Sequence, residues 1–235
     1  MIRTPDCLRP VIIRRHHLSS VPGSVLYQAG ETIVLCTAVI ESGVPPWRVG
    51  SGAGWLTAEY SMLPASTRPR KPRERSGKMD GRTTEIQRLI GRSLRAAVDL
   101  KRLGENTLMI DCDVLQADGG TRTAAISGAY VAVHDAIQAA LTAGQLAETP
   151  LIHAVAAISV GMIDNLIYLD LDYDLDSRAE VDMNVVQRGD GSLIEVQGTG
   201  EQGTFSRAQL DQLLDRAEVG LRQIFAIQQS AIAPQ

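Results

Sequence analysis

Short runs of alternating apolar and polar residues, separated by glycine and proline, fill the first quarter of the chain. Runs of this kind predict β-strands, and their spacing is typical of antiparallel strands joined by tight turns. The predicted strands cover residues 11–14, 24–28, 32–40 and 55–62. We therefore expect the chain to open with a meander or a set of hairpins.

Two helical patterns enclose a fifth strand in the middle of the chain. Over residues 84–103, apolar side chains recur three or four positions apart, and Thr84 with Gln87 can form a capping box at the start. Residues 107–115 are apolar and β-branched enough for a strand. Residues 123–142 contain many alanines, almost no charge and no proline, which predicts a helix buried on nearly every side.

The order of elements changes after Pro150. A helix is expected at 207–228, beginning at a capping box formed by Ser206 and Gln209. It follows four predicted strands, at 152–163, 166–172, 181–187 and 193–197. Strands followed by helices, twice over, predict an α+β protein of two similarly built lobes, residues 1–148 and 149–235, which is the arrangement of a diverged internal repeat.

Composition adds that the chain is an ordinary folded protein. Its 235 residues are 44% hydrophobic and 21% charged, and no apolar run reaches the roughly 20 residues that cross a bilayer. Residues 1–17 lack the pattern of a secretory signal, so we expect a cytoplasmic protein that binds no membrane. Cys7, Cys36 and Cys112 form no Cys-x-x-Cys pair, which argues against a disulfide framework or a zinc site. Cys36 and Cys112 lie in predicted strands and are expected to be core residues.

Charge is distributed unevenly along the chain. Residues 1–139 hold 18 Lys and Arg against 13 Asp and Glu, whereas residues 140–235 hold 5 against 14. Seven of the basic residues lie in the proline-broken stretch 64–82, namely Arg68, Arg70, Lys71, Arg73, Arg75, Lys78 and Arg82. This stretch is expected to be an irregular basic arm for a phosphate backbone, the alternative being a solvated charged loop.

The glycine pair Gly119-Gly120 separates the strand at 107–115 from the helix at 123–142. Glycines let the backbone approach a ligand closely, and the free N–H groups at a helix N-terminus attract anions. Thr121 adds a hydroxyl donor and Arg122 adds a planar guanidinium that can grip two phosphate oxygens. The turn is therefore a candidate phosphate site, although a plain helix entry with a surface arginine has the same sequence. Arg82, just before the helix at 84, is a second anion-friendly position.

Acidic residues gather between positions 170 and 182. An EF-hand is excluded, since Leu175 stands where glycine is needed and Val181 where glutamate is needed. Three of the acids, Asp170, Asp172 and Asp174, alternate as on one face of a solvated edge strand. Asp176 and Asp182 instead flank the turn 177–179, and Asp182 begins an apolar strand, so these two are the candidate ligands for Mg²⁺.

The sequence contains no recognisable nucleophile with its base. It has no Gly-x-Ser-x-Gly elbow, and His134 lies in the predicted buried helix without triad partners, which indicates a core or interface histidine. Two phosphate-ready arginines, a basic arm and two candidate metal carboxylates favour phosphoryl chemistry with an external attacking group. Inorganic phosphate bound at Arg82 and residues 120–122 would attack an RNA phosphodiester.

Several segments resemble the bacterial ribonuclease PH family, and the similarity extends over about residues 8–228. They include residues 54–60 (GWLTAEY), 81–83 (GRT), 85–92 (EIQRLIGR), 111–124 (DCDVLQADGGTRTA), 182–186 (DMNVV) and 195–199 (EVQGT). The resemblance implies the two-lobed, ribosomal-protein-S5 domain-2-like α+β fold and a hexamer built as a trimer of dimers. It also implies a phosphorolytic 3′-to-5′ exoribonuclease that releases nucleoside diphosphates. Such an enzyme trims the nucleotides beyond the CCA end of tRNA precursors, and it also acts on other RNA 3′ ends.

The resemblance also assigns roles to residues. Inorganic phosphate, the co-substrate, would be bound by Arg82, Gly120, Thr121 and Arg122. The catalytic residues would be Arg122 with Asp176 and Asp182, which would hold Mg²⁺ or assist proton transfer. Arg70 and Arg73 would contact RNA, and Arg68 is the candidate substitute for an arginine that the family commonly has where this chain has Ala65. Two other functions remain open from the sequence, a non-catalytic RNA-binding ring subunit and a hydrolytic nuclease.

Overall fold

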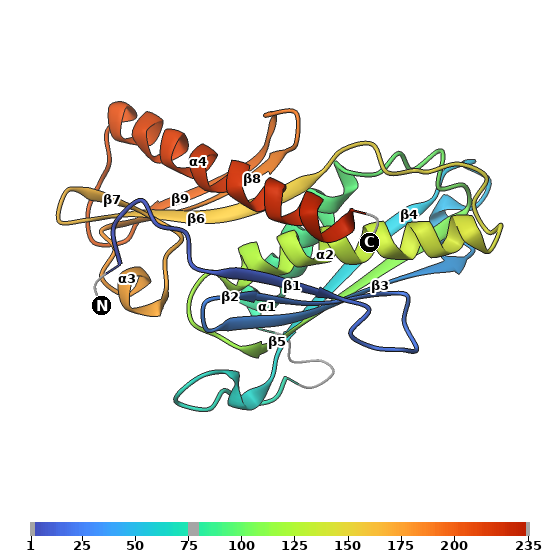
Figure 1. Ribbon diagram of the computed structural model, residues 1–235, viewed down its shortest axis with the longest axis horizontal. Helices are drawn as coiled ribbons and strands as arrows, with labels where there is room; N and C mark the ends of the chain where they lie inside the picture. The colour runs from blue at the N-terminus through green and yellow to red at the C-terminus, as the bar shows by residue number, and fades with distance from the viewer. Residues whose placement is uncertain (1–2, 75–79, 234–235) are drawn as a thin grey trace.

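The computed structural model describes residues 3–74 and 80–233. Its first sheet has five strands in the order β1-β2-β3-β5-β4 (Figure 1). These strands are β1 (Val11–Arg15), β2 (Gly23–Ala29), β3 (Thr32–Ser42), β5 (Asn106–Gln116) and β4 (Trp55–Met62). The pairs β1-β2, β2-β3 and β3-β5 are antiparallel, whereas β4 runs parallel to β5. The expected meander is therefore right for the first three strands and wrong for the fourth.

Helices α1 (Gly81–Arg95) and α2 (Thr121–Thr142) pack on one face of this sheet. The alternating strand residues that point to this face, such as Val34 and Ile110, are almost completely buried. Helix α2 is buried along nearly its whole length, as its alanine-rich sequence predicts. Gly128 brings α2 close to the sheet, because a Cβ at this position would lie 2.8 Å from the Cβ of Tyr27.

The second sheet has the order β7-β6-β8-β9 and is antiparallel throughout. Its strands are β6 (Val155–Ile163), β7 (Leu166–Leu169), β8 (Val181–Arg188) and β9 (Leu193–Gly200). Helix α4 (Arg207–Ile232) covers this sheet and begins at the expected capping box of Ser206 and Gln209. The short helix α3 (Tyr173–Asp176) lies between β7 and β8.

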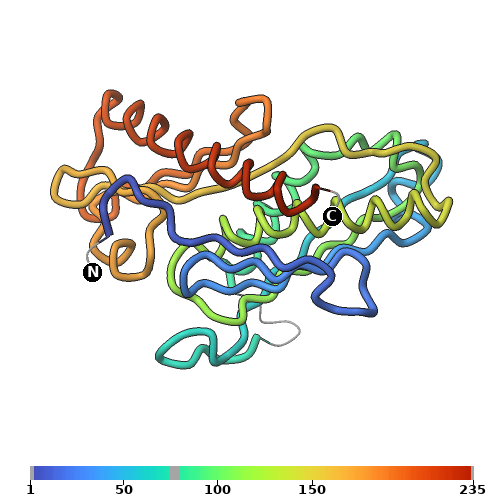
Figure 2. The backbone as a smooth tube through the Cα atoms, in the orientation of Figure 1, coloured from blue at the N-terminus to red at the C-terminus, as the bar shows by residue number. Residues whose placement is uncertain are grey.

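Helix α2 also packs against the second sheet. Ser127 exchanges hydrogen bonds with the backbone of Ala157 on β6, and the buried Gln228 of α4 donates to the carbonyl oxygens of Ser127 and Val155. Figures 1 and 2 show the last turns of α4 returning to lie over α2, and the N-terminal segment running beside the loop after β7. Helix α2 and the end of α4 therefore connect the two sheets.

Several element boundaries differ from those expected. Helix α1 begins three residues before Thr84, because the Asp80 side chain accepts the Arg82 backbone N–H and caps the helix. It also ends at Arg95, well before residue 103. Strand β7 ends at Leu169, so the acids that follow it are not on a strand edge. Cys36 and Cys112 are buried core residues, as expected. Among the described residues, no helix is both long and apolar enough to cross a membrane.

Candidate active site

The turn before α2 has the left-handed backbone that its glycines permit. Gly119 has a φ of 70° and Gly120 a φ of 64°, and Gly120 is the N-cap of α2, where it supplies no side-chain cap. Close packing also requires Gly119, since a Cβ there would lie 2.6 Å from the Leu171 carbonyl oxygen. The helix begins at Thr121, two residues earlier than expected. Thr121 and Arg122 thus belong to its first turn, where the N–H groups attract anions.

Tyr60 on β4 orients the Thr121 hydroxyl. The Tyr60 hydroxyl donates a 2.9 Å hydrogen bond to Thr121 Oγ1, so the Thr121 hydroxyl keeps its own hydrogen for another acceptor. Burial raises the pKa of Tyr60, while the hydrogen bond to Thr121 and the charges of Arg82 and Arg122 act in the opposite direction. Tyr60 therefore remains a neutral donor, and Thr121 is held ready to donate to a bound anion.

The Arg122 guanidinium is largely buried and held from two sides. Its Nη1 donates a 3.0 Å hydrogen bond to Gln197 Oε1 on β9 and lies 3.5 Å from Glu85 Oε1 on α1. Gln197 also donates to Glu85 at 3.0 Å, so the three residues Arg122, Gln197 and Glu85 contact one another in pairs. Glu85 therefore provides the negative charge opposite Arg122.

Arg82 lies in the first turn of α1 and is exposed. Its positive charge acts on both Tyr60 and Asp176, as does the charge of Arg122. The N-termini of α1 and α2 therefore each contribute one arginine to the same region. Two helix dipoles and two guanidinium groups make this region strongly favourable for phosphate.

Asp176 and Asp182 face these arginines from the second sheet and its connections. Asp176 ends α3 and Asp182 lies on β8. Desolvation is the largest cause raising the pKa of each carboxyl, and the negative charge of Glu201 raises both further. The positive charge of Arg122 lowers both in part, so both acids lie within range of this arginine's charge.

Asp182 has the one feature that fits a cation directly. Its Oδ1 is buried and accepts no hydrogen bond from the part of the chain that the structure describes. An unpartnered carboxylate oxygen is costly unless a positive group lies against it. Residues 3–74 and 80–233 contain no cluster of three or more metal-ligating side chains, and Mg²⁺ needs none, since it commonly takes one or two carboxylates with water and phosphate oxygens.

The other three acids of this region are not a solvated edge. Asp170 is buried and paired with Arg9, and its φ is 57°. Asp172 is the N-cap of α3, where its side chain accepts the Leu175 N–H at 3.0 Å, and Asp174 lies within α3. The prediction of an edge strand is wrong because β7 ends at Leu169. The three acids therefore do not lie on a strand, and their two-residue spacing does not place them on one face.

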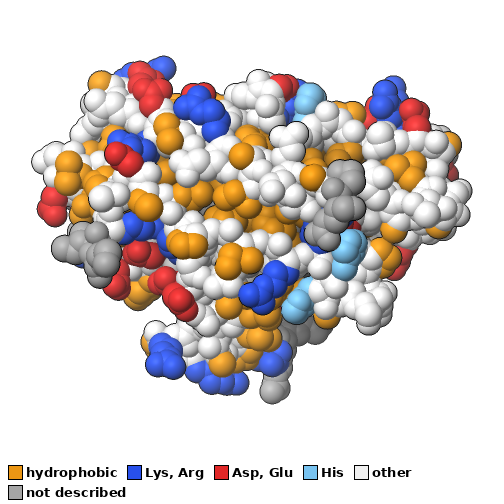
Figure 3. All heavy atoms as spheres, viewed as in Figure 1, with side chains coloured by type: hydrophobic (Ala, Val, Ile, Leu, Met, Phe, Trp, Pro, Cys, Tyr) orange, Lys and Arg blue, Asp and Glu red, His pale blue; other side chains and the backbone are white. Residues whose placement is uncertain are grey.

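The basic arm begins and ends beside the site. Ala117, just before the glycine turn, donates to the Ser66 carbonyl oxygen, and Thr83 in α1 donates to Glu74 at 2.7 Å. Between these anchors Arg68, Arg70 and Arg73 are exposed. Figure 3 shows basic side chains gathered on the projection that this arm forms at the lower edge of the molecule. The sequence also placed Arg75 and Lys78 in the arm, and both lie outside the described residues.

Sequence reasoning missed four residues of the site. Tyr60, Glu85 and Gln197 position Thr121 and Arg122, and Glu201 raises the pKa of both aspartates. Tyr60, Glu85 and Gln197 lie within segments that carried the family resemblance, which was the available signal. The sequence contained no signal for Glu201, because its proximity to Asp182 depends on how the loop after β9 folds back beside the start of β8.

The arrangement suits phosphoryl transfer in which a bound phosphate attacks and carboxylates face the reacting group. The chain belongs to the 3′ exoribonuclease family: the model of the family's domain 1 matches residues 7–138, and that of domain 2 matches residues 153–220. This membership confirms the resemblance, the fold class and the activity expected from the sequence, a phosphorolytic 3′-to-5′ exoribonuclease that uses phosphate.

Individual proteins agree with the family models. The chain is 58% identical over 232 residues to a ribonuclease PH of Mycolicibacterium smegmatis, covering 98% of this chain and 90% of that protein. It is 55% identical over 241 residues to a ribonuclease PH of Rhodopirellula baltica, covering 98% and 96%. A chain of the Archaeoglobus fulgidus exosome, in a structure with RNA bound to the active site, has a TM-score of 0.81 and 21% identity over 95% of this chain and 90% of that one. That last similarity concerns the fold.

Proposed function

We propose that this protein trims the 3′ ends of tRNA precursors and other RNAs, with inorganic phosphate bound at Arg82, Gly120, Thr121 and Arg122. The observation that carries this assignment is the oriented Thr121 hydroxyl beside the largely buried Arg122, at a helix N-terminus whose arginine acts electrostatically on the Asp176 and Asp182 carboxyls. In this proposal, a phosphate bound there lies opposite the two acids. It is thus the reacting group and not merely a counterion.

In the proposed reaction, a phosphate oxygen forms a bond to the phosphorus of the last phosphodiester. The bond from that phosphorus to the 3′ oxygen of the preceding nucleotide breaks, this oxygen takes up a proton, and a nucleoside diphosphate leaves. Arg122 acts as a catalytic residue by neutralising charge on the transferred group, and Arg82 and Thr121 hold the attacking phosphate in place.

Asp176 and Asp182 divide two tasks in this proposal, binding Mg²⁺ and moving the proton to the 3′ oxygen. A carboxyl with a raised pKa is suited to proton transfer, and the unpartnered Oδ1 of Asp182 is suited to a cation. Bound Mg²⁺ would supply charge stabilisation to the reacting phosphoryl oxygens. Chelation of divalent cations is expected to stop turnover, and full activity in excess chelator would remove the metal from the proposal.

The basic arm is the proposed RNA contact, through Arg68, Arg70 and Arg73. Its support is the position of the arm, which is tied to the residues before the glycine turn and to α1. An RNA strand following the arm would thus place its 3′ end near the phosphate. Ala65, also exposed, contributes no charge to this surface.

We also propose that the protein acts in the cytoplasm as a homohexamer built of dimers, each chain having lobes at 1–148 and 149–235. The lobe boundary is supported by the gap between the two family models, and by a loop at 143–149, exposed except at Leu146, where limited proteolysis should cut. The hexamer is supported by the outer face of the first sheet, where Leu35, Val39 and Met109 are partly exposed and no described helix packs. Sedimentation that finds only monomers would contradict it.

The test uses tRNA that carries a 3′ extension, incubated with Mg²⁺ in the presence and absence of inorganic phosphate. The proposal predicts shortening of the RNA only with phosphate, release of nucleoside diphosphates, and arrest near the mature end. Nucleoside monophosphates would instead indicate hydrolysis. RNA binding without any shortening would favour the non-catalytic ring subunit.

A further inference from the structure

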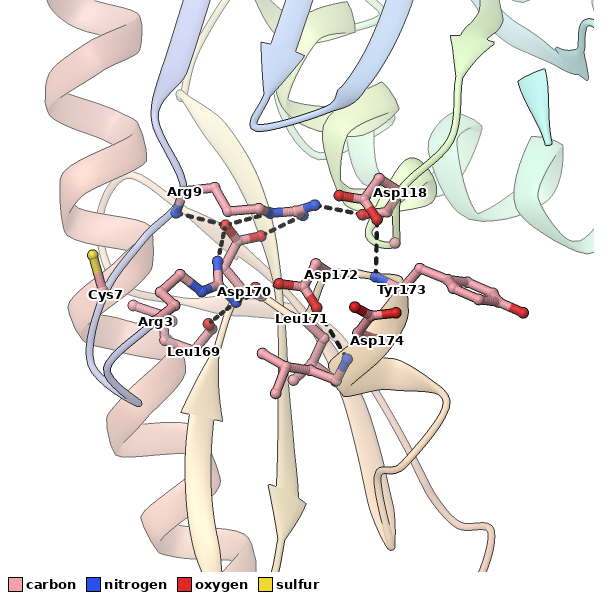
Figure 4. Close-up of polar contacts among 12 residues, drawn as sticks. Arg3, Cys7, Arg9, Asp118, Leu169, Asp170, Leu171, Asp172, Tyr173 and Asp174 are labelled. Carbon is pink, nitrogen blue, oxygen red and sulfur yellow. Dashed lines mark hydrogen bonds and ion pairs between the residues drawn. The ribbon is translucent and has the colours of Figure 1, made fainter. Parts of the chain in front are cut away.

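Arg9 and Asp170 form a buried ion pair that the proposed reaction does not use. Arg9 is 6% exposed and Asp170 is 4% exposed. Three bonds of 2.7–2.9 Å join them: the Arg9 backbone N–H and Nε donate to Asp170 Oδ2, and Nη2 donates to Oδ1 (Figure 4). The two residues are 161 positions apart, so the pair connects the segment before β1 to the segment after β7.

Arg9 also contacts the turn that precedes α2. Its Nη1 donates a 2.5 Å hydrogen bond to the Asp118 carbonyl oxygen, and a Cβ added at Gly120 would lie only 2.9 Å from its Nη2. Thr32 holds the same turn from β3, accepting the Asp118 N–H and donating to the Gly119 carbonyl oxygen. We call residues 118–120, which lead into the proposed phosphate site, the phosphate turn. The backbone of this turn is therefore held by the Arg9 guanidinium on one side and the Thr32 hydroxyl on the other.

Asp170 leads directly into the segment that carries Asp176. Its left-handed backbone is followed by Leu171 and Asp172, which pack against Gly119, and by α3, which ends at Asp176. The backbone N–H of Tyr173 at the start of α3 donates to the Asp118 side chain at 3.3 Å, as Figure 4 shows. The phosphate turn and the segment 170–176 thus meet at Asp118. Arg9 contacts both, through the Asp118 carbonyl oxygen and the Asp170 carboxylate.

We propose that Arg9 is a positioning residue, which fixes the phosphate turn relative to Asp176 by joining Asp170 to the Asp118 carbonyl. The proposal rests on the proposed function, since it assumes that phosphate binds at this turn. A buried ion pair adds little net stability over apolar residues of the same size, so its stability alone is a weak reason for Arg9 to be there. A fixed geometry is a stronger reason, because displacement of a reacting group by about 1 Å can cost a hundredfold in rate.

The experiment compares the same substitution at two arginines that both contact Asp170. Arg9→Lys keeps a positive charge beside Asp170 and keeps the backbone bond, but it removes the guanidinium that reaches the turn. Arg3→Lys is the matched control, because Arg3 bonds to the Leu169 and Asp170 carbonyl oxygens and to the Asp170 side chain without touching residues 118–120. Arg3 also lies 3.8 Å from the Asp172 carboxylate, and lysine keeps the positive charge beside both aspartates. Phosphate affinity is measured by titration calorimetry, and the KM values for phosphate and RNA are measured in the steady state.

Arg9→Lys should weaken phosphate binding and raise the KM for phosphate by at least about tenfold, with the KM for RNA changed by less than about twofold. Arg3→Lys should leave all three values within about twofold of wild type. Equal phosphate affinities for wild type and Arg9→Lys would overturn the proposal. A wild-type protein that releases no nucleoside diphosphates would overturn the proposed function instead, while calorimetry would still test the positioning of the turn.

A second pair of variants guards against a folding defect in Arg9→Lys. Asp118→Ala removes the acceptor for the Tyr173 N–H, whereas Asp118→Asn keeps an acceptor oxygen and removes only the charge. The positioning role predicts weaker phosphate binding in Asp118→Ala than in Asp118→Asn, with similar thermal unfolding for both. Equal phosphate affinity in the two variants would contradict a link from the Asp118 side chain to α3, whereas the Arg9 bond to the Asp118 carbonyl oxygen is tested by Arg9→Lys.

Discussion

Asp182 shows most clearly how this site is built at the scale of single residues. One of its carboxylate oxygens is buried without a hydrogen-bond donor among the described residues, and burial, Glu201 and Asp176 all raise its pKa. A charge held in this way destabilises the fold when no cation is bound. The residue is therefore expected to contribute to function at the expense of stability.

Asp182→Asn should abolish turnover and also stabilise the metal-free protein. The amide removes the unpaired charge, and a gain of about 1 kcal/mol corresponds to an increase of roughly 2–4 °C in unfolding temperature for a chain of this size. Asp174→Asn, an exposed position in the same segment, serves as the control with unchanged activity. Thermal unfolding in chelator and a phosphate-dependent activity assay provide the two readouts.

The pH dependence of this stabilisation follows from the direction of the shift. Because the folded-state pKa of Asp182 is raised, the folded protein binds its proton more tightly than the unfolded chain, and stability falls as pH rises through the raised pKa. The advantage of Asp182→Asn should therefore be greatest at neutral pH and shrink as the solution is acidified. An advantage that grows on acidification would contradict the assignment.

If phosphate binds as proposed, Glu85 competes with it for Arg122. Glu85→Gln removes the charge 3.5 Å from Arg122 Nη1 but keeps an oxygen that can accept from Gln197. Partly exposed ion pairs contribute about 1 kcal/mol or less, so the KM for phosphate should fall by up to about fivefold. Asp215→Asn, at an exposed position of α4, controls for net charge. An increased KM in Glu85→Gln would show that Glu85 supports phosphate binding rather than opposing it.

At the scale of elements, local patterns predicted most of the fold. The capping box at Ser206, the strands that became β2, β3 and β5, and the buried α2 all follow from short-range periodicity and cap chemistry. The parallel pairing of β4 with β5, the Asp80 cap of α1 and the burial of Asp170 do not, because each depends on a partner distant in sequence or on a competing cap. The same is true of the Tyr60, Gln197 and Glu201 contacts within the site.

Two helix glycines give opposite predictions for the same change. Gly91→Ala in α1 should stabilise the protein by roughly 0.5–1 kcal/mol, because the new Cβ meets only the Arg95 guanidinium, at an ordinary contact distance of 3.4 Å. Gly128→Ala in α2 should destabilise it by about 1–3 kcal/mol, since its Cβ would lie 2.8 Å from Tyr27 and 2.9 Å from Cys36 Sγ. Urea unfolding of both variants measures the difference. Equal effects would contradict the close packing of α2.

At the scale of the whole molecule, the proposed role of the basic arm is to bring RNA toward a site formed by both sheets. Arg70→Ala and Arg73→Ala should each weaken RNA binding and reduce the slope of log affinity against log salt by about 0.7 for each RNA phosphate that is no longer neutralised. Arg207→Ala, at a side chain 83% exposed on α4, is the control and should leave the slope unchanged. A wild-type salt slope in both arm variants would place the RNA elsewhere.

The central claim is that phosphate bound at the N-terminus of α2 is the attacking group. The most direct measurement follows radiolabelled inorganic phosphate during degradation of an RNA with a defined 3′ end. The label should appear as the terminal phosphate of each released nucleoside diphosphate, in wild type but not in Arg122→Ala. Unlabelled nucleoside monophosphates, released at a rate independent of phosphate, would contradict the claim.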